Sequence, residues 1–280
     1  MSQFPTIFDT GLIARHLARR PQGSDFVTDL VIADMQDRLG ALIRDFPKAL
    51  IIGPDVDRLP AFGQTASASF AFERLPAFRA DQADELPEIL DKDYNLIVSL
   101  LHLQAVNDVP GYLARLRARL APDGLLLIAT LGGNTLTELR EAFLAADAMI
   151  LGGANARVAP MLQVRDGGAL LQRAGLALPV ADVETYTVRY DSLFALMRDL
   201  RSFGMTNMLA GRSRKPVSRQ FFIEAAQLYA ARHGDPDGRI RATFSIIYLS
   251  GWAPHESQPK PLKPGSATVR LADALKAPKN

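Results

Sequence analysis

Short apolar runs of the length of strands punctuate the first half of the chain. Ala49–Gly53 (ALIIG), Asn95–Leu101 (NLIVSLL) and Leu125–Thr130 (LLLIAT) contain almost no polar residue and predict buried strands, and Ser67–Glu73 (SASFAFE) predicts a weaker one. Longer segments of helical periodicity separate and follow these runs. Buried strands that alternate with helices indicate a parallel sheet covered on both faces.

The helices of this half carry recognisable end signals. Ser24 is a candidate N-cap for a helix over 25–45, in which apolar residues recur every three or four positions. A second helix is expected over 109–120. Thr135 and Glu138 have the spacing of a capping box, which predicts that a third helix begins there and runs to about Met149.

The pattern changes after residue 160. A short helix is predicted over 166–174, with Gly175 as its stop. Two long strand-like runs follow, at 178–190 and 241–252, and two helical patterns, at about 191–203 and 216–232, lie between them. We therefore expect an α/β fold: a doubly wound, Rossmann-like sheet with an antiparallel C-terminal strand pair and a helical insertion at about 191–240.

Composition limits the classes of partner and of site. Apolar residues make up 48% of the 280 residues, and 32 basic against 30 acidic side chains leave a net charge of +2, which gives no strong signal for nucleic acid. The chain has no cysteine, which excludes thiolate nucleophiles and cysteine-ligated metal. No apolar run reaches the ~20 residues of a membrane span. The first twenty residues mix arginines with a periodic apolar pattern, and we expect a cytoplasmic protein rather than one with a targeting segment.

Several segments carry a more specific pattern: Phe8-Asp9, Asp123-Gly124, Gly132–Leu136, Glu138–Arg140, Leu170–Gly175, Gly251-Trp252, His255–Gln258 and Gly265–Ala267. These segments resemble the class I S-adenosylmethionine-dependent methyltransferases, and in particular one branch of them. This branch contains the mitochondrial complex I assembly factor 5 proteins, described as methyltransferase-like arginine hydroxylases, and their bacterial relatives. The resemblance covers nearly the whole chain and implies N-terminal helices over 1–45 and a methyltransferase-like domain over 46–280.

The resemblance implies a cofactor site that this sequence only partly keeps. Gly53 matches the glycine-rich turn that lets the backbone approach S-adenosylmethionine, but a proline, two carboxylates and a branched side chain follow it, in Pro54-Asp55-Val56-Asp57. Glu73, taken as the end of its strand, would hold the ribose, and Asp81 would accept from the adenine amino group. We therefore expect S-adenosylmethionine to bind weakly or not at all.

The end of the strand at 95–101 supplies the remaining candidates. Leu101 would contact the cofactor, and His102 and Gln104 are weak catalytic candidates, because ligands of such sheets bind beyond the carboxyl ends of the strands. His102 could act as a base, or it could be an ordinary hydrogen-bonded histidine. No metal site is predicted, because an iron site of two histidines and a carboxylate would require His102 and His255 to meet.

Three functions remain open at this point. The chain could be a methyltransferase that binds S-adenosylmethionine, an assembly or interaction protein for respiratory complex I, or a protein-arginine hydroxylase, the last two by resemblance. The eroded glycine turn favours the second over the first. We also expect Trp252 to be largely buried and residues 255–267 to wrap the sheet domain.

Overall fold

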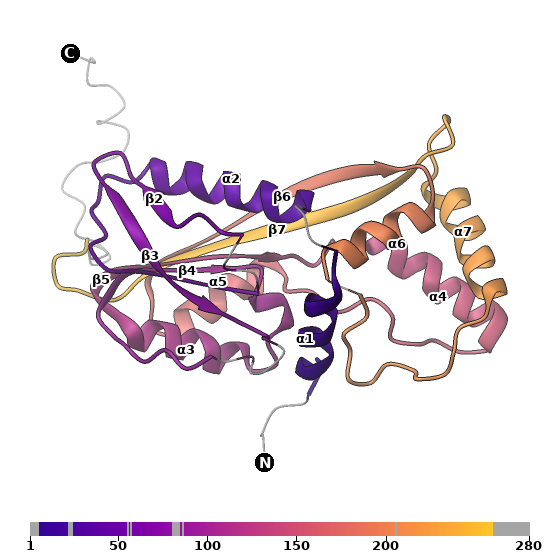
Figure 1. Ribbon diagram of the computed structural model, residues 1–280, viewed down its shortest axis with the longest axis horizontal. Helices are drawn as coiled ribbons and strands as arrows, with labels where there is room; N and C mark the ends of the chain where they lie inside the picture. Colours follow the sequence, from indigo (N-terminus) through magenta and orange to yellow (C-terminus); the bar gives the residue numbers. More distant parts are fainter. Residues whose placement is uncertain are drawn as a thin grey trace, which may run out of the picture.

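The computed structural model describes residues 6–21, 25–54, 56, 58–79, 85, 87–204 and 206–259. A seven-stranded sheet of order β2-β3-β1-β4-β5-β7-β6 forms its centre (Figure 1). The strands are β1 (Ala49–Gly53), β2 (Phe62–Gln64), β3 (Ser69–Pro76), β4 (Tyr94–Leu100), β5 (Leu120–Leu131), β6 (Ala177–Tyr190) and β7 (Ile240–Trp252).

The sheet is parallel in its centre and antiparallel at both edges. β1, β3, β4 and β5 pair in parallel, whereas β2 joins β3 in the opposite direction. β7 lies between β5 and β6 and runs antiparallel to both. This arrangement confirms the predicted doubly wound sheet and its C-terminal antiparallel pair, which is the layout of the class I methyltransferase fold.

Helices cover both faces of the sheet. α2 (Phe26–Gly40) packs on one face, while α3 (Val109–Arg119) and α5 (Val164–Arg173) pack on the other (Figure 1). Alternate residues of β1 enter the two resulting cores, so that Ile51 joins the core under α2 and Leu50 joins the core over α3. Such strands, buried on both faces, explain the apolar runs in the sequence.

The remaining helices build one end of the molecule. α4 (Thr137–Leu151), α6 (Leu193–Ser202) and α7 (Arg219–His233) lie together beside the far half of the β6–β7 ribbon, and α1 (Thr10–Arg19) stands between them and the sheet (Figure 1). α6 and α7 are the predicted insertion between the last two strands. None of the helices in the described ranges is long and apolar enough to cross a membrane.

The predicted capping box at the start of α4 is wrong. Leu136 is the N-cap residue, with a φ of 55°, and its side chain makes no capping hydrogen bond. The hydroxyl of Thr135 instead donates to the carbonyl of Ser245 over 3.1 Å, and the carboxylate of Glu138 accepts from the backbone of Thr243 over 3.1 Å. Both side chains therefore connect the start of α4 to β7 and do not cap the helix.

Other boundaries also differ from the prediction. α2 ends at Gly40 rather than near 45 and is capped by the side chain of Asp25, while Ser24 lies outside the described residues. β3 begins and ends later than predicted, and the short edge strand β2 was not predicted. Gly175 does stop α5, with a φ of 78°.

The C-terminal segment returns to the amino end of β5. Trp252 is only partly buried, contrary to prediction, and its ring lies 4.7 Å from the guanidinium of Arg44. Gln258 donates from Nε2 to the carboxylate of Asp123 (2.8 Å) and to the carbonyl of Ala253 (2.8 Å). Residues 252–259 thus lie against the sheet domain, and the remainder of the predicted wrapping segment falls outside the described residues.

Candidate functional site

The carboxyl ends of β1 and β4 meet at the edge of the sheet where ligands of such folds bind. A β-carbon on Gly53, the last residue of β1, would lie 2.9 Å from the carbonyl oxygen of Leu100. Leu101, the residue after β4, has a left-handed backbone conformation with a φ of 50°. Its amide donates to the carbonyl of Ala129 over 2.9 Å. The strands are therefore too close for any residue but glycine at position 53.

A cavity of only about 30 Å³ remains at this edge. Side chains from α1, α2 and the end of α6 cover it, and they include Leu17, Val31 and Phe203. No described residue of its lining carries a carboxylate. This space holds about one water molecule, whereas pockets for small molecules usually span 300–1,000 Å³. The described part of the site to which the resemblance assigns S-adenosylmethionine therefore offers little free space, while Asp55, Asp57 and Asp81 lie outside the described residues.

Gln104 lines this cavity, but both ends of its amide are engaged by the protein. Its Nε2 donates to the carbonyl of Leu101 over 2.7 Å, and its Oε1 accepts from the hydroxyl of Thr130 over 3.0 Å. Only 5% of the residue is exposed to solvent. Gln104 thus holds the ends of β4 and β5 together.

His102 is fully buried beside the cavity and is not among its lining residues. The imidazole lies between the rings of Phe78 and Tyr112, with centroid distances of 5.0 and 4.9 Å, and its Nε2 is 2.7 Å from the carbonyl oxygen of Glu85. This arrangement matches the alternative of a hydrogen-bonded structural histidine.

Glu73 does not occupy the position expected of a ribose-binding carboxylate. β3 continues three residues beyond it, to Pro76, and Glu73 pairs with Leu50 rather than with the end of β1. Its carboxylate accepts a hydrogen bond from the hydroxyl of Tyr94, at the opposite end of β4 from the cavity. Burial and the Glu73 carboxylate raise the pKa of Tyr94 well above its usual value. The expectation that Glu73 ends its strand is therefore wrong.

The other expected ligands cannot be combined into a site. Asp81, Asp55 and Asp57 lie outside the described residues. His255 is exposed near the amino end of β5, where its Nδ1 is 2.7 Å from the hydroxyl of Ser257, whereas His102 is at the carboxyl end of β4. The meeting of the two histidines that an iron site would require does not occur. The described residues contain no other cluster of potential metal ligands.

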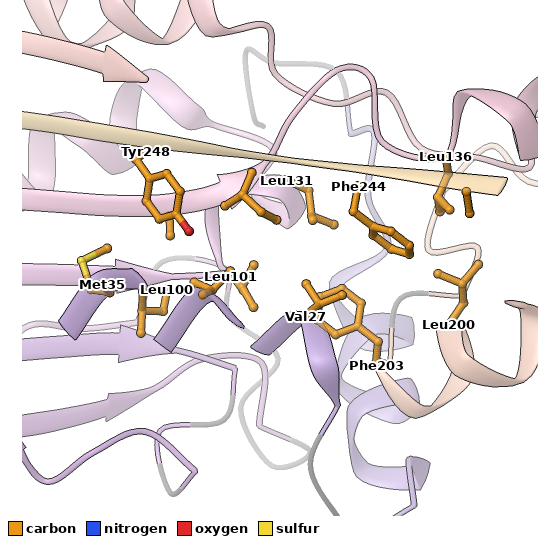
Figure 2. Close-up of a cluster of buried hydrophobic side chains, with 14 of the residues drawn as sticks. Val27, Met35, Leu100, Leu101, Leu131, Leu136, Leu200, Phe203, Phe244 and Tyr248 are labelled. Atoms are coloured by element: carbon orange, nitrogen blue, oxygen red, sulfur yellow. The ribbon is translucent and has the colours of Figure 1, made fainter. Parts of the chain in front are cut away.

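A second, larger cavity of about 210 Å³ lies among α4, α6, α7 and β7. Its walls are mainly apolar and aromatic, and they include Leu131, Leu136, Leu200, Phe203 and Phe244, whose side chains belong to the buried hydrophobic cluster drawn in Figure 2. Phe203 lines both cavities, which are therefore neighbours. No sequence pattern predicts this cavity, because the segments that form its wall are far apart in the chain.

A buried ion pair forms part of the wall of the second cavity. The carboxylate of Asp147 is fully buried and accepts from Nε and NH2 of Arg157 over 2.9 and 2.6 Å, and from the side chain of Asn155 over 3.2 Å. Burial raises the pKa of Asp147, but the hydrogen bonds from Arg157 and Asn155 outweigh burial and hold the pKa below its usual value. The Arg157 guanidinium also lies 4.2 Å from the centre of the Phe221 ring.

Comparison with known proteins gives two groups of relatives. An arginine-hydroxylase NDUFAF5, mitochondrial, of Danio rerio is 33% identical over 90% of this chain and 83% of its own length. The protein of the same name from Dictyostelium discoideum is 41% identical, over 68% of this chain and 44% of its own length, so the chain spans less than half of that relative. The prediction of a cytoplasmic location is corrected by these relatives, which are named as mitochondrial proteins.

The second group consists of methyltransferases. The malonyl-acyl-carrier-protein O-methyltransferase of Xylella fastidiosa is 32% identical over 88% of this chain and 83% of its own length. Among solved structures, that of the YcgJ protein of a Bacillus species aligns with a TM-score of 0.46 at 11% identity, over 81% of this chain and 99% of that one, which is too weak to carry a conclusion. No family model matches the chain. The chain belongs to the family of the NDUFAF5 arginine-hydroxylases and has a methyltransferase-like fold.

Proposed function

We propose that this protein supports assembly of respiratory complex I through a protein partner and does not rely on tight binding of S-adenosylmethionine. The observation that supports the proposal is the small cavity of about 30 Å³ that the described residues leave at the carboxyl ends of β1 and β4. A methyltransferase needs an open site for its cofactor at this edge. The family membership supplies the direction of the proposal, since the relatives at 33% and 41% identity are named arginine-hydroxylases rather than methyltransferases.

The chemistry of the wall also disfavours the cofactor. S-adenosylmethionine carries a sulfonium, an amino group, a carboxylate and two ribose hydroxyls, and burying such groups without partners is costly. The polar side chains of the described lining are those of Arg20, Thr28 and Gln104; none of them is a carboxylate, and the amide of Gln104 is already engaged. Each missing hydrogen-bonded contact costs about 1–3 kcal/mol, so two or three of them shift a micromolar ligand toward the millimolar range.

Calorimetric titration with S-adenosylmethionine and S-adenosylhomocysteine tests this proposal. We expect no saturation at low micromolar concentration for the unmodified protein. Leu17→Ala and Phe203→Ala each shorten a side chain of the cavity wall, whereas Ile223→Ala shortens an exposed side chain on α7 and is the matched control. Saturable binding of either compound by the unmodified protein at low micromolar concentration would overturn the proposal and restore a methyltransferase.

Arginine hydroxylation is the second candidate, because it is the activity named for the relatives. The two candidates separate in cells that lack this protein. Loss of a hydroxyl group from an arginine of complex I, detected by mass spectrometry as the loss of one oxygen atom, would support a hydroxylase. Loss of assembled complex I without any change in arginine hydroxylation would support an assembly factor that acts by binding alone. Normal assembly together with unchanged arginines would contradict both.

A further inference from the structure

The cavity of about 210 Å³ among α4, α6, α7 and β7 is large for the interior of a protein of this size. Interiors are packed as densely as organic crystals, and an engineered apolar cavity of roughly 150 Å³ binds benzene. The walls here are suited to the same kind of guest, because they include Phe143, Phe221, Phe222, Met161 and Met197. The cavity has room for one aromatic ring or a short aliphatic chain.

The polar groups in its wall are nearly all satisfied within the protein. The hydroxyl of Thr135 donates to the carbonyl of Ser245, and that of Thr206 lies 2.9 Å from Nδ1 of His16. Asn207 donates to the carbonyl of Ala156 over 2.9 Å and accepts from the amide of Leu209 over 3.1 Å. The charge of Arg157 is neutralised by the buried Asp147.

Arg201 is the exception. It is an exposed residue near the end of α6 that also lines the cavity, and no described side chain forms an ion pair or hydrogen bond with it. The cavity therefore combines an apolar interior with a single uncompensated positive charge in its lining. A guanidinium binds carboxylates through two parallel hydrogen bonds, which makes it a specific partner for this group.

We propose that this cavity binds a small carboxylic acid with an aromatic or short aliphatic tail, with the tail among the phenylalanine and methionine side chains and the carboxylate on Arg201. The proposal goes beyond the proposed function and does not depend on it, because the lining given for this cavity shares only Phe203 with the lining of the smaller one at the ends of β1 and β4. The ligand would be a free small molecule, because the volume matches a single ring or chain.

Methionine methyl groups provide a local reporter of binding. Met161, Met197 and Met208 line the cavity, whereas Met35 on α2 and Met149 at the end of α4 do not. In protein with isotope-labelled methionine methyl groups, titration with 4-phenylbutanoate or octanoate should shift the first three resonances and leave the other two unchanged. Unchanged Met35 and Met149 resonances also show that each variant is folded.

Matched variants and ligands separate the contributions of charge and of the apolar interior. Arg201→Gln should weaken the binding of both carboxylates about 10-fold or more, as expected for loss of a charged hydrogen bond. The same variant should bind octan-1-ol as tightly as the unmodified protein. Arg198→Gln removes an exposed arginine of the same helix that does not line the cavity, and should change nothing. Val158→Phe adds bulk in the cavity and should weaken all three ligands.

The outcomes that contradict the proposal are equally specific. It is wrong if the carboxylates cause no methionine shifts at about 10 mM, a concentration far above a useful affinity. It is also wrong if octylammonium binds as well as octanoate, or if Arg201→Gln and Arg198→Gln bind octanoate equally. None of these results bears on titration with S-adenosylmethionine, so failure of this proposal and failure of the proposed function can be told apart.

Discussion

The hydroxyl of Thr130 donates a 3.0 Å hydrogen bond to the side-chain carbonyl of Gln104, and both residues are buried. This contact joins the carboxyl ends of β4 and β5 at the small cavity. Gln104→Leu should destabilise the protein by about 1–3 kcal/mol, because it leaves a buried hydroxyl without its acceptor. Urea denaturation measures this change.

The double variant Gln104→Leu/Thr130→Val tests whether the contact itself contributes to stability. It removes both polar groups, so its loss of stability should be smaller than the sum of the two single losses. Additive losses would mean that the 3.0 Å contact contributes nothing of its own.

The buried pair of Asp147 and Arg157 leads to a second prediction. Arg157→Met leaves the fully buried Asp147 carboxylate without its counter-charge and should cost about 3–5 kcal/mol. Asp147→Asn combined with Arg157→Met should recover part of this loss, because the remaining amide is neutral. The pKa of the Asp147 carboxyl is lower in the folded protein than its value of about 3.8 in the unfolded chain. The carboxylate therefore stabilises the fold above pH 3.8, and this stabilisation is lost as the pH falls below that value. Denaturation should accordingly be measured at about pH 7.

A matched control for this pair is available on the surface. Arg239 and Asp191 form an ion pair of 3.3 Å in which the aspartate side chain is 85% exposed. Arg239→Met should therefore have little effect on stability. An equal loss for Arg157→Met and Arg239→Met would contradict the importance of burial.

A third prediction concerns the pH dependence of α1. His16 lies 2.9 Å from the hydroxyl of Thr206, and burial, followed by the charges of Arg212, Arg15 and Arg19, lowers its pKa. The unfolded segment therefore binds a proton more readily than the folded one. The stabilisation is complete above the unfolded pKa of about 6.5 and is lost as the pH falls through and below it.

Hydrogen exchange can follow this effect at the buried residues Ile13 and Ala14 of α1. Their protection factors, which account for the intrinsic pH dependence of exchange, should fall between about pH 7.5 and pH 5.5. His16→Gln should abolish most of the change, whereas His255→Gln, at an exposed histidine, should preserve it. The same pH dependence in both variants would rule out His16 as its source.

A fourth prediction isolates residues 252–259. A chain that ends after Gly251 lacks Trp252, which packs on Arg44, and Gln258, which donates to Asp123. Compared with a chain that ends after Pro259, it should be less stable by about 2–3 kcal/mol, because it loses a partly buried aromatic ring, the hydrogen bond from Gln258 to Asp123 and the two backbone hydrogen bonds of Ala253 with Asp123 and Gly124. Equal melting temperatures would show that this segment adds nothing to the fold.

Most strands were predictable because burial on both faces leaves a direct mark on the sequence, whereas their order in the sheet was not predicted beyond the antiparallel pairing of the last two. β1 and β4 were recognised within one residue at either end for this reason, and β6 and β7 by their length. The end of β3 was not, because it is determined by pairing with β1, in which Pro76 lies opposite Gly53. Glu73 was misplaced as a consequence.

Side-chain roles were harder to predict than strands. Thr135 and Glu138 have the spacing of a capping box, but their partners are Ser245 and Thr243, more than one hundred residues away. His102 was correctly placed at a strand end, yet its two ring neighbours come from other segments. The larger cavity gave no signal at all, since a void depends on how distant segments pack.

The position of β7 has a consequence for the synthesis of this chain. The strand lies between β5 and β6, and its pairing with β5 joins Leu125 to Trp252, near the end of the described chain. Until Ile240 and the residues after it have been made, β5 lacks a partner on one side and β6 lacks one on both sides, and other chains can pair with these open edges. The nascent chain therefore exposes unpaired strand edges for a long part of its synthesis. A chain truncated before residue 240 would be prone to aggregation.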